Sequence, residues 1–251
     1  MAFDLWHYLF VFARISVFMA VCPVFFPTGS PRTLKVVASL AFTMAMAPLP
    51  GLVPAEQEFI GNTLFCIVRE GLIGAIMGSA VQMPFAALRG AGSLMDMQTG
   101  LSMAHMVDPS SGQSQTALSS FMGTLSLVIF LGLDGHLWVL DGLASSFRTL
   151  PVGGPWPRLA GIGAWIEMTG LILATTLQAA APIVALMLLT EFTLGIVSRV
   201  LPQLNLLVLG QPVRFAMGIA AAVAVIGLLE PLNSRILSDF MGRWAAMIAK
   251  L

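Results

Sequence analysis

The side chains in this sequence that could do chemistry are mostly charged groups inside apolar stretches. They are Arg14, Arg69, Glu70 and Glu191. An ionisable group at the centre of a membrane helix costs about 2.5–3.5 kcal/mol on insertion scales, so such groups face protein or water. The sequence therefore predicts that all four are buried. Because one chain of about six helices offers little interior, we favour burial against partner subunits over pairing within the chain.

The sequence gives little support for catalysis or metal binding. The three histidines are far apart, and neither an HExxH motif nor a Cys/His ligand spacing occurs. In "LDGHLWVLDG", Asp134, His136 and Asp141 could form a proton relay. We favour instead a helix end near a membrane interface, with Trp138 as an aromatic anchor. We therefore expect no enzymatic activity, no cofactor and no metal.

The composition is that of an integral membrane protein. Of 251 residues, 57% are hydrophobic and only 10% are charged, whereas about 25% are charged in soluble domains. The net charge is zero and there is no basic block, so a nucleic-acid partner is not expected. Cys22 and Cys66 lie in apolar runs, which predicts two small buried side chains rather than a disulfide.

Apolar segments long enough to cross a membrane indicate an all-α, polytopic fold. About 17–25 apolar residues span the hydrocarbon core as a helix. The expected helices cover residues 5–26, 34–52, 59–83, 117–140, 164–190 and 213–232, all within a single domain of residues 1–251. The N-terminal stretch carries Asp4 just before the first segment and Arg14 in the middle of it, so we expect a retained helix and not a cleaved signal peptide.

Two further segments have their own character. Residues 91–116 are rich in Gly, Ser, Gln and Met and nearly uncharged, which predicts a long loop. Residues 234–251 place apolar side chains at three-to-four-residue spacing, which predicts an amphipathic C-terminal helix. Its apolar face would lie at an interface, dock on a partner or pack on the chain itself, and the sequence does not decide between these.

Three stretches carry a resemblance to a known family. They are "GLSMAHMVDPSSG" (Gly100–Gly112), "FLGLDGHLWVLDGLASSFRTLPVG" (Phe130–Gly153) and "SRVLPQLNLLVLGQPVRFAMG" (Ser198–Gly218). With them the chain resembles the FliR family of flagellar export-gate proteins, whose injectisome counterparts are the SctT proteins. The segments "ARISVFMAVCPVFFPTGSPRTLKV" and "REGLIGAIMGSAV" fit the same family, so the similarity covers nearly the whole chain.

The resemblance implies a non-enzymatic role in a multi-subunit helical gate of the bacterial inner membrane, in the flagellar basal body. Partners would be FliP-type and FliQ-type subunits, an FlhB-type switch protein, membrane lipid and unfolded exported proteins. The loop after the third helix would plug the pore. By resemblance its residues are Gly100, Leu101, Met103, Met106, Asp108, Pro109 and Gly112. The residues of a subunit-contact loop would be Arg199, Pro202, Gln203, Asn205, Gly210 and Pro212.

Two positions depart from the family pattern, and two questions stay open. Met103 stands where an aromatic residue is expected, and Gln211 precedes Pro212 where the family usually has an apolar residue. The sequence does not distinguish a flagellar from an injectisome system. The alternative function is a secondary transporter for a small solute, for which the segment around Pro182 and Glu191 would be an interrupted helix.

Overall fold

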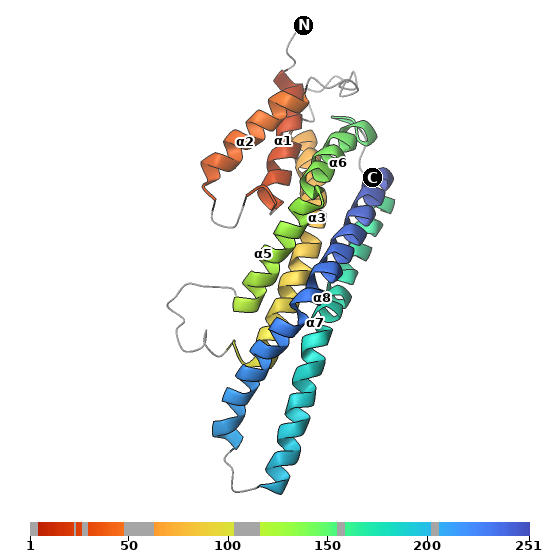
Figure 1. Cartoon of the computed structure of the whole chain (residues 1–251). Helices are drawn as coiled ribbons and strands as arrows, with labels where there is room; N and C mark the ends of the chain where they lie inside the picture. The colour runs from red at the N-terminus through yellow and green to blue at the C-terminus, as the bar shows by residue number, and fades with distance from the viewer. Residues whose placement is uncertain are drawn as a thin grey trace. The chain divides into compact units, whose positions relative to one another are not determined.

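A computed structural model gives the fold of most of the chain. It describes residues 5–22, 24–26, 30–47, 63–102, 116–154, 159–201 and 206–251. In these ranges the chain forms α-helices and no β-strand, which confirms the predicted all-α class (Figure 1).

The described ranges contain seven helices. In chain order they are α1 (Leu5–Val21), α2 (Arg32–Met46), α3 (Thr63–Thr99), α5 (Ala117–Gly132), α6 (Gly135–Thr149), α7 (Leu159–Val200) and α8 (Leu206–Lys250). Three of them are much longer than a membrane-spanning minimum: α3 has 37 residues, α7 has 42 and α8 has 45.

The third helix extends further than the sequence predicts. We expected it to end at Met83 and a loop to begin at residue 91, but α3 continues through Pro84 to Thr99. A proline inside a helix removes one backbone donor. Burial of the following turns compensates for that loss, since Leu88 and Met95 are both inaccessible to solvent. The prediction of a loop over residues 91–99 is therefore wrong.

The segment predicted as one helix over residues 117–140 is two helices in the structure. Asp134 has a φ of 55°, in the left-handed region, and separates α5 from α6. Aspartate adopts left-handed backbone conformations more often than most residues, because its short polar side chain can hydrogen-bond to the local backbone. The break follows an apolar helix without any proline, so the hydropathy pattern alone gives no sign of it.

The predicted C-terminal helix is not separate from the helix before it. It forms the last part of α8, which runs through Pro231. Every residue of its apolar face is buried. These are Ile236, Leu237, Phe240, Met241, Trp244, Met247, Ile248 and Leu251. The indole Nε1 of Trp244 donates a hydrogen bond to the carbonyl oxygen of Met77 at 3.1 Å. Of the three alternatives, packing on the chain itself is therefore the correct one.

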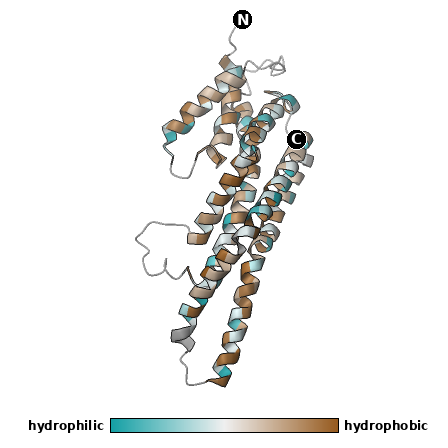
Figure 2. Ribbon diagram, in the orientation of Figure 1, coloured by the Kyte–Doolittle hydropathy of each residue, from teal (hydrophilic) through white to brown (hydrophobic). Residues whose placement is uncertain are grey.

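By length and composition, two helices could each cross a membrane alone: Thr63–Thr99 and Gly161–Val200. The described residues hold up to four such spans if α5 with α6 and the two parts of α8 each count as one bent span. This is fewer than the six segments that the sequence predicts. Figure 2 shows hydrophobic residues along most of the length of α7.

The chain divides into two compact units. Unit 1 comprises Met1–Met83, Asp134–Gly170 and Ser238–Leu251. Unit 2 comprises Pro84–Leu133 and Leu171–Leu237. The long helices α3, α7 and α8 each contribute to both units.

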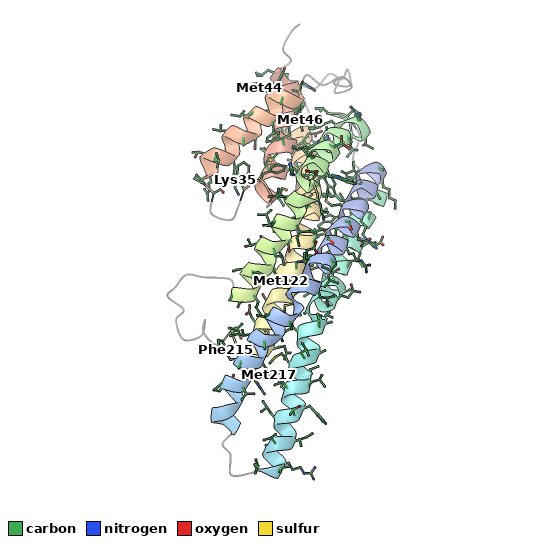
Figure 3. The ribbon with its side chains drawn as sticks, in the orientation of Figure 1. Lys35, Met44, Met46, Met122, Phe215 and Met217 are labelled. Carbon is green, nitrogen blue, oxygen red and sulfur yellow. The ribbon has the colours of Figure 1, made fainter. Side chains whose placement is uncertain are left out.

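Each unit has a buried interior and an apolar exterior. In unit 1, α1 packs against α2, and on α2 Met46 is buried while Met44 is exposed (Figure 3). In unit 2, Met122 of α5 is buried, whereas Phe215 and Met217 of α8 are nearly half exposed (Figure 3). Exposed apolar side chains of this kind are typical of a surface that meets lipid or other subunits.

Candidate functional site

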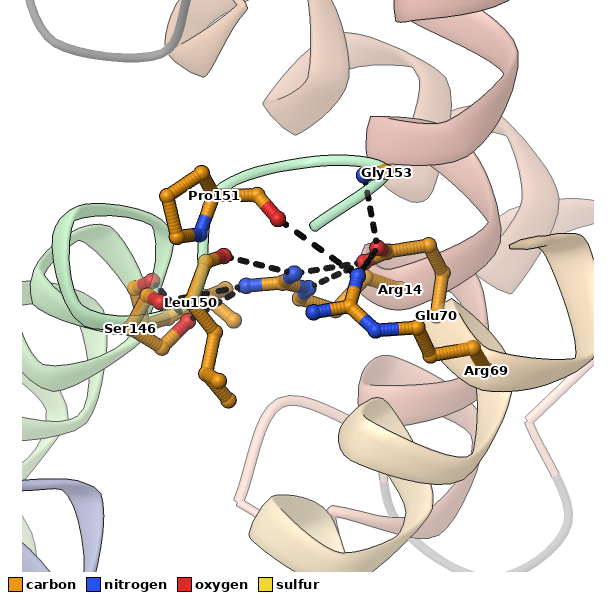
Figure 4. A network of polar contacts seen from close by, with 8 residues as sticks. Arg14, Arg69, Glu70, Ser146, Leu150, Pro151 and Gly153 are labelled. Carbon is orange, nitrogen blue, oxygen red and sulfur yellow. Dashed lines mark hydrogen bonds and ion pairs between the residues drawn. The ribbon is translucent and has the colours of Figure 1, made fainter. Parts of the chain in front are cut away.

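Unit 1 contains a buried cluster of three charged side chains, which we call the charge cluster: Arg14, Arg69 and Glu70. Arg14 comes from α1, and the other two are adjacent on α3. The Nε of Arg14 donates to Oε2 of Glu70 at 2.6 Å, and Nη1 of Arg69 donates to Oε1 at 2.5 Å (Figure 4). At most 1% of any of these side chains is exposed.

The remaining donors of Arg14 contact the C-terminal end of α6. Its Nη1 donates to the carbonyl oxygen of Ser146 at 3.2 Å, and its Nη2 donates to that of Leu150 at 3.0 Å (Figure 4). Its guanidinium lies 4.3 Å from the ring centre of Phe147. The carbonyl groups at a helix C-terminus carry partial negative charge, and an aromatic face attracts cations, so both stabilise the buried Arg14.

The turn after α6 also bonds to the charge cluster. The backbone N–H of Gly153 donates to Oε1 of Glu70 at 3.4 Å, and Nη1 of Arg69 donates to the carbonyl oxygen of Pro151 at 3.4 Å (Figure 4). Gly153 has a φ of 72°, which a residue with a Cβ rarely adopts. The turn that presents its N–H to Glu70 therefore depends on glycine.

Small residues let α1 approach α3 closely enough for the charge cluster to form. A Cβ placed on Gly74 would lie 2.3 Å from the carbonyl oxygen of Arg14, and one on Gly78 would lie 3.0 Å from that of Phe18. The sequence pattern Gly-x-x-x-Gly is typical of such close helix contacts. In this chain it serves packing within unit 1.

The charge cluster therefore joins α1, α3 and the end of α6. Both oxygens of Glu70 accept hydrogen bonds from the chain itself, and the side chain is fully buried, so solvent does not reach it. The prediction of burial is correct for Arg14, Arg69 and Glu70, but the partners are within the chain. Their burial is thus no sign of other subunits, contrary to our expectation.

In unit 2 the structure describes the two ends of the predicted plug loop. Gly100 and Leu101 follow α3 directly, and Gly100 has a φ of 78°. The other predicted plug residues lie outside the described residues; they are Met103, Met106, Asp108, Pro109 and Gly112.

A buried aspartate that the sequence analysis missed lies at the base of this loop. Asp96 of α3 is fully buried, and its Oδ2 accepts hydrogen bonds from the backbone N–H groups of Leu118 at 2.9 Å and Ser119 at 3.2 Å, in the first turn of α5. An acidic residue in the last turn of a helix opposes the helix dipole, so it needs a compensating partner. That unfavourable placement is the signal in the sequence that could have identified Asp96.

The loop base also contacts α8, where the third family-like stretch continues. A Cβ placed on Gly100 would lie 3.1 Å from Oε1 of Gln211, and one on Gly218 would lie 2.5 Å from Cγ2 of Thr99. An apolar cavity of about 260 Å³ adjoins this contact, with Met95 and Leu118 in its wall. Two motifs that are more than a hundred residues apart in the sequence thus meet in unit 2.

The predicted subunit-contact loop is described only at its two ends. Arg199 lies in the last turn of α7 and is exposed, Gly210 is buried in α8, and Pro212 is exposed in the same helix. The other predicted members, Pro202, Gln203 and Asn205, lie outside the described residues.

The prediction that Glu191 is buried is not met within the chain. Its side chain is 35% exposed, and its Oε1 lies 3.5 Å from Nη2 of Arg214, which is 38% exposed. The two charges line an open groove of about 340 Å³ together with Ser198 and Gln211. Because about a third of the Glu191 side chain is exposed, its carboxylate is both paired and hydrated.

The histidine and aspartates of the "LDGHLWVLDG" segment lie at a helix end. Asp134 is the residue directly before α6, Asp141 is exposed, and Trp138 is 58% exposed. No hydrogen bond joins Asp134, His136 and Asp141 to one another among the described contacts. Over the described ranges, no group of three or more His, Cys, Asp or Glu side chains could hold a metal ion.

Comparison with known proteins gives matches over nearly the whole chain. Residues 5–240 match the family model of bacterial export proteins, family 1. The chain is 32% identical to the flagellar biosynthetic protein FliR of Escherichia coli strain K12 over 246 residues, 97% of this chain and 93% of that protein. It is 29% identical to the same-named protein of Bacillus subtilis strain 168, over 88% and 86%. It is 24% identical to the surface presentation of antigens protein SpaR of Shigella flexneri, over 79% and 78%.

Proposed function

The chain belongs to family 1 of the bacterial export proteins, and from this membership we propose that it is a core subunit of the flagellar protein export gate. It is an all-helical, membrane-embedded component of a type III export apparatus. With FliP-type and FliQ-type subunits it forms the channel through which unfolded flagellar proteins cross the inner membrane, and an FlhB-type protein acts as its switch.

The observation that carries the proposal is the match of a single family over residues 5–240. A match of that length includes α1 to α7 and most of α8, so it does not rest on one motif. The flagellar assignment rests on identity, which is 32% to the E. coli flagellar relative and 24% to the Shigella SpaR relative. These values favour a flagellar system over an injectisome.

A gate for unfolded chains must seal against ions at rest and still present no strongly charged surface to its substrates. The loop between α3 and α5 suits that role in composition, because methionine side chains are flexible and fill irregular gaps. We infer that this loop closes the channel at rest. The anchoring of both its ends in unit 2 supports the inference, since a plug must return to the same place after each passage.

The alternative, a secondary transporter, gains no support from the helices concerned. Substrate sites in such transporters are formed by discontinuous helices in both halves of the chain. Here α7 passes through Pro182 as α-helix, so the segment on which this alternative was based is not interrupted there. The transporter would also take up its solute as this chain alone, whereas the export gate requires partners.

Co-expression tests the assembly. The chain, tagged and expressed with FliP-type and FliQ-type proteins of the same organism, should copurify with both at a fixed, low stoichiometry. The matched control is expression of the tagged chain alone, which should give heterogeneous, poorly soluble material in detergent. A homogeneous monomer that leaves both partners in the flow-through contradicts the proposal.

Ion conductance tests the role of the loop. Deletion of Gly100–Ser111 should leave the assembled complex intact and raise its small-ion conductance in a planar bilayer. An intact complex with unchanged conductance after the deletion shows that the loop does not close the channel.

A further inference from the structure

An open groove of about 400 Å³ lies in unit 1, between α6 and the C-terminal part of α8. Its volume falls in the range of about 300–1,000 Å³ that is usual for small-ligand sites. Its wall is mostly apolar and contains one carboxylate. The lining residues are Leu137, Trp138, Asp141, Gly142 and Ser145 of α6 and Trp244, Ala245 and Ile248 of α8.

Asp141 supplies this carboxylate, between an aromatic ring and a hydroxyl group on one face of α6. Trp138 precedes it by three residues and Ser145 follows it by four, which is the spacing of neighbours on a helix surface. Asp141 is exposed, and none of the ion pairs between described residues includes it. A charge on an apolar surface of a membrane protein is costly unless a counter-charge or water meets it. The groove therefore offers a cation a position that the described part of the chain does not fill.

Trp244 is a buried wall of the groove, and its N–H group is already bonded. The indole Nε1 donates to the carbonyl oxygen of Met77. A Cβ on Gly142 would overlap the indole ring, so this glycine lets the ring lie directly against α6. The indole thus offers a ligand only its ring carbon atoms, and aromatic rings attract cations.

The exposed side chains beside the groove favour a lipid over a helix of another subunit. Helices that pack closely in membranes meet at small residues. Here Leu137 and Trp138 are bulky and more than half exposed, and Gly142 is already in contact with Trp244. Both exposed side chains lie in the first turn of α6, and tryptophan is enriched at the headgroup level of membranes. The groove therefore suits a headgroup better than a helix.

We propose that this groove binds a phospholipid whose headgroup ends in an ammonium group. The ammonium pairs with the carboxylate of Asp141 and lies against the ring of Trp138. Ser145 Oγ donates to the carbonyl oxygen of Gly142 at 2.9 Å, which leaves its lone pairs to accept a bond from the ammonium. The described residues that line the groove include no Lys, Arg or His, so a purely anionic headgroup finds no counter-charge there.

Carbodiimide coupling tests this contact, because it joins a carboxylate to an amine only where the two groups touch. The full chain, with any subunits that copurify, is reconstituted in vesicles of phosphatidylethanolamine and phosphatidylglycerol, treated and digested. Mass spectrometry then measures the phosphatidylethanolamine adduct on each carboxylate. We expect severalfold more adduct at Asp141 than at Glu167, an exposed carboxylate of unit 1 that does not line the groove.

A matched pair of tryptophan variants tests the aromatic contribution. Trp138→Leu keeps an apolar side chain but removes the ring, so the adduct at Asp141 should fall severalfold. Trp6→Leu is the control, because Trp6 is as exposed on α1 as Trp138 is on α6 and does not line the groove. The adduct in this variant should equal that of the parent protein.

Fluorescence quenching tests the headgroup preference without a coupling reagent. The contribution of Trp138 to the emission is the difference between the parent protein and Trp138→Phe. In vesicles of phosphatidylglycerol, a small fraction of brominated phosphatidylethanolamine should quench this contribution more than the same fraction of brominated phosphatidylglycerol. The preference should disappear in Asp141→Asn, which removes the charge at nearly equal volume.

These outcomes do not depend on the export function, since the groove lies within this chain. Equal adducts at Asp141 and Glu167, or equal losses in Trp138→Leu and Trp6→Leu, overturn the proposal. Equal quenching by the two brominated lipids in the parent protein also overturns it. Coupling of Asp141 to a lysine of another subunit, in place of the lipid, overturns it as well and assigns the groove to a protein contact.

Discussion

The ion pairs Arg14–Glu70 in unit 1 and Arg214–Glu191 in unit 2 have the same chemistry and opposite environments. The first is completely buried at 2.6 Å, and the second is more than a third exposed at 3.5 Å. Two exposed charges keep most of their hydration and attract each other weakly. Two buried charges lose their hydration, so each then depends on its partner. The structural role of an ion pair here follows from burial and not from residue type.

Removal of the buried anion should have the largest effect. Glu70→Gln leaves Arg14 and Arg69 buried without a counter-charge, so we expect it to lower the free energy of unfolding by about 3–5 kcal/mol. Urea titration in detergent, followed by size-exclusion chromatography with fluorescence detection, measures the folded fraction. The matched control is Glu230→Gln, at an exposed position of α8. Equal unfolding midpoints for the two variants would show that the contribution of a glutamate to stability does not depend on its burial.

A change in the spacing between α1 and α3 should have the second-largest effect on stability. Gly74→Ala brings a Cβ to 2.3 Å from the carbonyl oxygen of Arg14, so α1 must move away from α3, at a cost of about 1–3 kcal/mol. Gly71→Ala is the control, since its Cβ would make an ordinary contact of 3.6 Å with Cγ2 of Val17. The same urea titration should give a lower unfolding midpoint for Gly74→Ala than for Gly71→Ala. If both alanines are tolerated equally, the close approach of α1 to α3 is not required.

The pH dependence of stability tests the burial of the Cys22 thiol, which directly follows α1. Burial raises the pKa of the Cys22 thiol to about 12, despite an opposing effect of hydrogen bonds from the backbone at Val24 and Phe25. The unfolded chain loses this proton near pH 9, so stability is full below that pH and falls as pH rises from about 9 towards 12. We expect a loss of about 1 kcal/mol by pH 10.

Cys22→Ala is the control for the pH effect. It should flatten the part of the stability profile that lies between pH 8 and pH 10, in buffers of roughly that range. The thiol of the parent protein should also resist maleimide at pH 8 until urea unfolds the chain. Rapid labelling of the folded protein at Cys22 would contradict its burial.

The exposed ion pair should give the smallest effect. Glu191→Gln should change the unfolding free energy by about 0–1 kcal/mol, and less at high salt, because the pair is solvated. Urea titrations of Glu191→Gln and of the parent protein, each at low and at high ionic strength, measure this change in unfolding free energy. A loss comparable to that of Glu70→Gln would contradict the exposure of this ion pair in the folded chain.

Much of the fold follows from the sequence because local rules decide it. Long apolar runs favour helices, because a helix satisfies the backbone groups of the segment internally, and the ordered motifs place the chain in its family. The burial of Arg14 and Glu70 is also predictable, since a charge in an apolar helix must avoid lipid. The errors lie where two local rules compete: proline predicts an end of α3 at Met83, yet packing of the following turns keeps the helix intact.

The tertiary structure alone decided which groups meet. Arg14 and Glu70 are 56 residues apart, and Asp96 reaches an N–H group 22 residues away, distances at which no local pattern specifies a partner. Periodicity shows that the C-terminal part of α8 has an apolar face, but not that the chain itself covers it. Pairing and coverage depend on how helices pack, and packing is the sum of many contacts that are remote in the sequence.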